Sequence, residues 1–178
     1  MSNVRSISKV ASPGRVTADF FTHSHRFSAS VIVYKRRLID VLADRMTNYL
    51  DLVDIYVSRN NNPGEIVATY HRGALVKQEI NFIVLPSETQ AISKERFYSP
   101  TRTSRPIFIT VPFFEISGLF QWMGEIDVKK IMTAETQKFL PILEINAANP
   151  FFPEVSFQGP TALVNKSKIQ TLCISDDR

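Results

Sequence analysis

The chain has 178 residues, of which 44% are hydrophobic and 21% charged, a balance typical of a protein with a packed core. A single cysteine, Cys173, excludes an internal disulfide, and its apolar neighbours predict a buried thiol. No apolar run reaches the roughly 20 residues of a membrane-spanning helix, and residues 1–26 carry no signal-peptide pattern. We therefore expect a cytoplasmic protein without a membrane span.

The charge is uneven along the chain. Residues 1–110 hold 15 Lys and Arg against 9 Asp and Glu, whereas residues 111–178 hold 6 against 8. A basic first part is compatible with a patch for nucleic acid or a membrane surface. It is equally compatible with a basic and an acidic part that meet in an oligomer.

Residues 1–25 are predicted to form a flexible N-terminal arm, because the segment contains few apolar side chains. Residues 26–34 predict a strand with β-branched side chains on one face. Residues 37–44 predict a short helix, since apolar residues recur at i, i+3 and i+4. Residues 49–59 predict a strand in which Leu50, Leu52, Asp54 and Tyr56 alternate with Asp51, Val53, Ile55 and Val57.

A polar turn is expected at residues 60–64, since Asn and Gly tolerate positive φ and Pro fixes its own φ. We then expect a strand at 65–70, a turn at 71–73, a short strand at 74–76 and a buried strand at 79–85. A first unit of order β-α-β-β-β is therefore predicted over residues 26–86.

A second unit is predicted over residues 113–175, with its helix at 126–132. It follows a linker at 87–112 that is rich in Ser, Thr, Pro and Arg and includes an expected extra strand at 107–111. The two units match in the same order at Phe27 and Phe114, Ile39-Asp40-Val41 and Ile126-Asp127-Val128, Tyr49–Ile55 and Phe139–Ile145, Ala74-Leu75-Val76 and Ala162-Leu163-Val164, and Ile80 and Ile169. We therefore predict an α+β, mostly β protein made of two tandem diverged copies packed as a pseudo-dimer.

The run Arg37-Leu38-Ile39-Asp40-Val41-Leu42-Ala43-Asp44, between two expected strands, resembles the RLxDxLN pattern of a family of small, β-rich, uncharacterised bacterial domains. In that family a second strand resembling FIxVxDVxV follows, and it corresponds here to residues 49–57. The resemblance covers about 30 residues of the first copy and departs from the pattern at Ala43, where the family prefers Asn. It implies a strand–helix–strand unit and no activity.

No catalytic constellation is readable, and we expect the protein not to be an enzyme. His23 and His25 would share one face of a strand, but two partly exposed histidines are the favoured interpretation, and neither a metal nor another cofactor is expected. The sequence has no GxxxxGK[ST] or GxSxG motif. Asp40 and Asp127, which the repeat matches, are expected to bind a backbone turn rather than to carry chemistry.

Basic residues are interleaved with aromatic ones in segments 34–37 and 94–105, a composition that binds single-stranded nucleic acid by charge and base stacking. The candidate contacts are Lys35, Arg36, Arg37, Lys94, Arg96, Phe97, Tyr98, Arg102 and Arg105. The alternative for these residues is an ordinary solvated linker and strand end.

Two adjacent aromatic residues, Phe151 and Phe152, lie between Pro150 and Pro153, where the first copy has its polar turn. Exposed apolar clusters mark interaction sites, and the alternative is that one ring packs under the loop. The leading expectation is a non-enzymatic interaction or assembly protein that binds itself or another protein subunit. The alternatives are a nucleic-acid-binding protein and a sensor that binds a small molecule between the copies.

Overall fold

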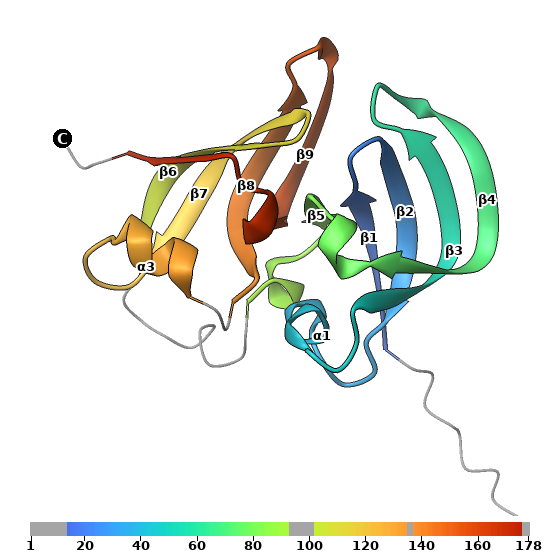
Figure 1. Cartoon of the computed structure of the whole chain (residues 1–178), viewed down its shortest axis with the longest axis horizontal. Helices are drawn as coiled ribbons and strands as arrows, with labels where there is room; N and C mark the ends of the chain where they lie inside the picture. Colours follow the sequence, from blue (N-terminus) through green and yellow to red (C-terminus); the bar gives the residue numbers. More distant parts are fainter. Residues whose placement is uncertain (1–13, 93–101, 135–136, 176–178) are drawn as a thin grey trace, which may run out of the picture.

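The structure is a computed structural model that describes residues 14–92, 102–134 and 137–175. These residues form one antiparallel sheet of ten strands in the order β10-β6-β7-β8-β9-β5-β1-β2-β3-β4. Figure 1 shows β5 between a group of strands from the first half of the chain and a group from the second half. The prediction of a mostly β chain is confirmed.

The two halves carry their elements in the same order. The first half consists of β1 (Arg15–Phe21), β2 (His25–Ile32), α1 (Leu38–Ala43), β3 (Tyr49–Arg59), β4 (Asn62–Val76), the 3₁₀ turn η1 (Lys77–Glu79) and β5 (Phe82–Leu85). After a further 3₁₀ turn, η2 (Glu88–Gln90), the second half consists of β6 (Thr103–Val111), β7 (Phe114–Trp122), α3 (Val128–Thr133), β8 (Phe139–Asn149), β9 (Phe152–Asn165), η3 (Lys166–Lys168) and β10 (Thr171–Ile174). The strands expected at 49–59 and 107–111 are confirmed as β3 and part of β6.

An irregularity recurs in the central strand of each half. Asp54 in β3 and Glu144 in β8 have φ angles of 53° and 49°, in the left-handed region that non-glycine residues rarely adopt. The pairing with the preceding strand shifts register beside each of them, between Ser28 and Ser30 and between Ser117 and Leu119. Such β-bulges bend a strand and increase its twist, so each half curves at the same place.

The two halves share their core across β5. Phe21 of β1 and Phe82 of β5 are fully buried and stack with ring centroids 4.3 Å apart, and both rings pack against Phe114 of the second half. In the opposite direction, Phe139 and Leu163 of the second half lie in the core of the first. The halves are therefore joined by hydrophobic packing as well as by the pairing of β5 with β9.

The N-terminal segment differs from the prediction, because residues 15–21 are a strand that pairs with β2 and β5. Val16, Ala18 and Phe20 are buried and alternate with more exposed residues. The low overall hydrophobicity of the segment hid this period-two pattern. The rest of the expected arm, residues 1–13, lies outside the described residues.

The expected turn at His71-Arg72-Gly73 is wrong, since these residues lie within the continuous strand β4. Gly73 lies opposite Leu52 in the ladder, and a Cβ atom there would meet the free end of the Ile55 side chain, at 2.8 Å from Cδ1. The match of Leu75 with Leu163 is also displaced by one residue. Leu75 lies opposite Leu50, and Val164 lies opposite Leu140, so Leu75 corresponds to Val164. A slip of one residue exchanges the two faces of a strand.

The helix of the second half begins at Val128, two residues later than predicted. Asp127 is its N-cap, and the carboxylate accepts a hydrogen bond from Lys130 N at 3.1 Å. Asp40 instead lies inside α1 and accepts a hydrogen bond from Arg37 N at 3.2 Å. Both acids bind the backbone as expected, but they act from opposite ends of a helical turn, so the match of residues 39–41 with 126–128 is wrong.

Cys173 is exposed, so the prediction of a buried thiol is wrong. It lies in β10 at one end of the sheet, and within the described part of the chain β10 pairs only with β6. An apolar run in a strand at the sheet edge is left partly open to solvent, which the sequence run alone does not reveal.

Candidate interaction sites

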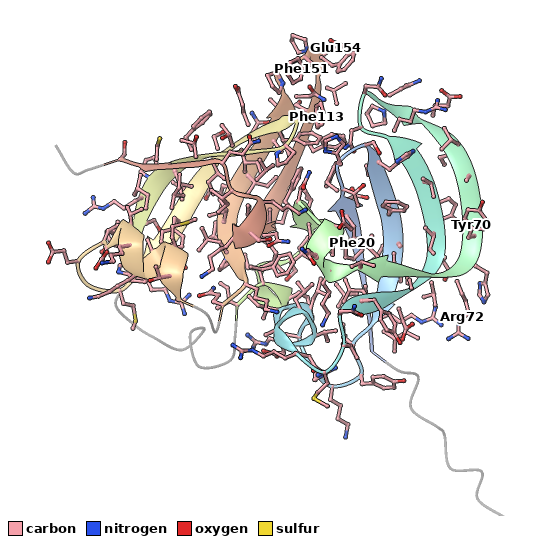
Figure 2. All side chains as sticks on the ribbon, in the orientation of Figure 1. Phe20, Tyr70, Arg72, Phe113, Phe151 and Glu154 are labelled. Carbon is pink, nitrogen blue, oxygen red and sulfur yellow. The ribbon has the colours of Figure 1, made fainter. Side chains whose placement is uncertain are left out.

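Three turns expose aromatic rings at one end of the molecule. Phe113 in the β6–β7 turn is 40% exposed, and Phe151 in the β8–β9 turn is 68% exposed. Their ring centroids are 5.9 Å apart, and the ring of Phe113 also contacts His23 of the β1–β2 turn at 4.5 Å. Figure 2 shows Phe113 and Phe151 together at this end. We call His23, Phe113, Phe151 and Phe152 the aromatic tip.

Hydrogen bonds tie these turns to the sheet. The buried Asn81 donates from Nδ2 to Thr22 O at 3.2 Å and to Pro112 O at 3.3 Å, and so connects turns from the two halves. Asn149 Oδ1 accepts a hydrogen bond from Phe151 N at 3.0 Å. Phe113 has a φ of 67°, which costs a non-glycine residue about 1–2 kcal/mol. Backbone strain that surrounding contacts maintain is a common feature of binding sites.

The predicted interaction residues lie together at this tip. Pro150 and Phe151 form the β8–β9 turn, and Phe152 and Pro153 begin β9. Phe152 is 37% exposed, so neither ring is buried beneath the loop. The corresponding β3–β4 turn of the first half is polar, at Asn60 and Asn61.

A pocket of about 560 Å³ lies at the junction of the two halves, next to α1 and α3. The basic side chains that line it are Arg45, Lys77, Lys138 and Lys166. Burial lowers the pKa of the Lys77 ammonium, although the nearby Asp44 carboxylate opposes this effect. The pocket has the position that the small-molecule alternative requires, and the binding of a ligand there stays a prediction.

The basic segments have several structural contacts within the chain. Arg36 Nη1 donates to Asp44 Oδ2 at 2.9 Å, and Arg37 donates to the carbonyl of Ile92. Arg102 donates to Gln121 Oε1 at 3.2 Å. Lys35 is exposed, and Arg105 lies half-buried in β6. Lys94, Arg96, Phe97 and Tyr98 lie outside the described residues, so the nucleic-acid contact of segment 94–105 stays a prediction.

His23 and His25 do not converge on a shared site. The ring of His23 contacts Phe113, whereas His25 Nδ1 lies 2.8 Å from Ser24 Oγ. Within residues 14–92, 102–134 and 137–175, no group of three or more His, Cys, Asp or Glu side chains is arranged to hold a metal ion. Among the helices that the structure describes, none is long and apolar enough to cross a membrane.

Comparison with known proteins gives no relative: no family model, no curated protein and no solved structure matches the chain.

Proposed function

We propose that this protein is a non-enzymatic assembly subunit, and that the aromatic tip is a contact through which it associates with other copies. The observation that carries the proposal is the contact between Phe113 and Phe151, two rings that are 40% and 68% exposed on turns held by hydrogen bonds. Fully burying one Phe side chain contributes roughly 1.5–3 kcal/mol, so covering this tip favours association.

The comparison between the halves supports a role in binding rather than in folding. The first half forms the same hairpin with Asn60 and Asn61 at its turn, so the hairpin itself does not require aromatic rings. The backbone of the tip is already fixed by Asn81 and Asn149, and a fixed loop loses less entropy when it docks.

We also propose that the two halves arose by tandem duplication and pack as a pseudo-dimer. The common order of elements supports this, as do the acids Asp54 and Glu144 at the bulge of each central strand. A duplicated body explains how one copy of a turn became aromatic while the other remained polar.

The test replaces the aromatic turn by its counterpart from the first half, in the double variant Phe151→Asn/Phe152→Asn. We expect weaker association in sedimentation velocity and an unchanged melting temperature. Tyr34→Ser is the matched control, since Tyr34 is 69% exposed and lies outside the tip. Normal association together with a melting temperature lowered by several degrees would assign the rings to the fold and overturn the proposal.

A further inference from the structure

The ten-stranded sheet ends in two strands that each have one open edge. Among the residues that the structure describes, β4 pairs only with β3 and β10 pairs only with β6. β4 spans 15 residues, and Figure 2 shows Tyr70 and Arg72 along this strand at the margin of the molecule. A long open edge presents unpaired N–H and C=O groups that a further strand can bind.

The junction inside the chain shows how such an edge is covered. β5 pairs with β1 on one side and with β9 on the other, so that Phe82 lies opposite both Phe21 and Val164. β10 holds the place of β5 in the second half, because Thr171 lies opposite Thr110 of β6 as Phe82 lies opposite Phe21 of β1. Among the described residues, β10 has no counterpart of the second partner that β5 has in β9.

β4 in turn holds the place of β9. Leu75 lies opposite Leu50 in β3 as Val164 lies opposite Leu140 in β8. Residues 161–165 of β9 are all buried, whereas among residues 72–76 of β4 only Leu75 is buried. The segment that β5 covers in one half is therefore exposed in the other.

We propose that β10 of one copy pairs antiparallel with β4 of a second copy and repeats the β5–β9 junction between chains. Transfer of the register places Thr171 opposite Leu75 and Cys173 opposite Gly73. The contact is head-to-tail, so it generates a closed ring or an open filament rather than an isolated two-fold dimer. This inference rests on the proposed role in assembly and names a second copy of this chain as the partner.

The side chains at the junction differ in a complementary way. An added Cβ at Gly159 of β9 would lie 2.7 Å from Val84 Cγ1, so a side chain at this position would have to displace the valine of β5. In the proposed contact Tyr70 takes the place of Gly159, and Cys173, which has one γ atom instead of two, takes the place of Val84. Tyr70 is 60% exposed in the single chain, and in the contact it would cover the Cys173 thiol.

The sole cysteine of the chain allows a direct test of the register. Asn165 N donates to Asn81 O, which makes that pair a hydrogen-bonded one. Pairs alternate along an antiparallel ladder, so Val84 and Ala162 are a non-hydrogen-bonded pair. Cys173 and Gly73 of the second copy correspond to this pair, whose Cα separation of about 4.5 Å suits a disulfide.

The experiment oxidises the variant Gly73→Cys and separates the products on a denaturing gel without reductant. We expect a ladder of cross-linked dimers, trimers and longer species. In the matched control Arg72→Cys the new side chain lies on the opposite face of β4, so this variant should give no ladder. The second control, Gly73→Cys/Cys173→Ser, should remain monomeric on the gel. Cross-linking in that variant would show that β4 pairs with β4 of the partner and would overturn the proposal.

A second measurement needs no substitution. The reactivity of Cys173 toward a thiol reagent in the unmodified protein should fall as the protein concentration rises, because the contact covers it. If sedimentation shows association but Cys173 stays equally reactive and no ladder forms, the edge pairing is overturned and the proposed assembly role stands. If the protein remains monomeric at every concentration, both the assembly role and the edge pairing are overturned.

Discussion

Lys77 and Lys166 make equivalent hydrogen bonds in the two halves. Each begins the 3₁₀ turn that follows the long hairpin. The ammonium group of each donates hydrogen bonds to backbone carbonyls at the end of the helix in its own half. Lys77 Nζ donates to Val41 O, Asp44 O and Thr47 O at 2.7–3.0 Å. Lys166 Nζ donates to Ile131 O at 2.9 Å and to Ala134 O at 2.6 Å. Both lysines thereby supply the donors that the last turn of a helix lacks.

Lys77→Met should lower the free energy of unfolding more than Lys166→Met. Lys77 is the more buried of the two, and each carbonyl left buried without a donor costs about 1–3 kcal/mol. Urea denaturation of both variants measures the difference. The exposed Lys129→Met is the control and should change stability little. Equal losses in all three variants would contradict the capping role.

Residues 49–59 were predictable as a strand because side chains of different character alternate along its first part. Leu50 and Leu52 lie in the core as this alternation requires, but the bulge at Asp54 shifts the pattern. Ile55 is therefore buried, and Tyr56, which alternation groups with Leu50, is 47% exposed. The strand β1 was missed although Val16, Ala18 and Phe20 alternate in the same way. Ala18 is only weakly hydrophobic, and the low mean hydropathy of residues 1–25 concealed the contribution of Val16 and Phe20.

The aromatic turn was predictable as a difference between the halves, but its neighbours were not. Phe113 and His23 are distant in sequence from Phe151, and only the sheet topology brings their turns together. The open edges were also hidden, since the sequence of a strand does not state how many neighbours it has. The exposure of Cys173 follows from the position of β10 at the edge of the sheet.

Asp44→Asn should make the stability of the folded protein less dependent on pH in acid. The guanidinium of Arg36, at 2.9 Å, and the backbone N–H of Met46 hold the pKa of Asp44 below its ordinary value of 3.8. The unfolded chain therefore takes up this proton first as the pH falls. The stability from these contacts is present above pH 3.8 and is lost as the pH falls through the folded pKa.

Urea denaturation at neutral pH and well below pH 3.8 checks this expectation. The variant should be less stable than the unmodified protein at neutral pH, and the difference should shrink in acid. Asp51→Asn removes an exposed charge of the same sign and controls for net charge. A stability difference of the same size at both pH values would contradict the prediction.

Asn165→Val should destabilise the junction between the halves by about 1–3 kcal/mol, because it leaves a buried carbonyl without its donor. Asn165 Nδ2 donates to Ile80 O at 2.8 Å, and Oδ1 accepts from Ser167 N at 3.1 Å. Thermal unfolding monitored at Trp122 and by circular dichroism should shift together, since the two cores interpenetrate. Separate transitions would show that the halves unfold independently.

The reciprocal change, Val76→Asn, tests the junction between copies. Val76 holds the place of Asn165, because it lies opposite Tyr49 as Asn165 lies opposite Phe139. It is 43% exposed in the single chain, so the substitution should alter the unfolding free energy of the dilute protein by no more than about 0.5 kcal/mol.

In the head-to-tail contact the new amide would reach Ile169 O of the next copy, as Asn165 reaches Ile80 O within the chain. A hydrogen bond made at the expense of two solvated groups contributes about 0.5–1.5 kcal/mol, which is a gain of roughly twofold to tenfold in the association constant. Sedimentation equilibrium of Val76→Asn against the unmodified protein measures this gain. Val76→Ser, which removes the same apolar side chain but is too short to reach the carbonyl, is the control. Equal association of the Asn and Ser variants would mean that Val76 does not face Ile169 of a neighbour, and the transferred register would be wrong.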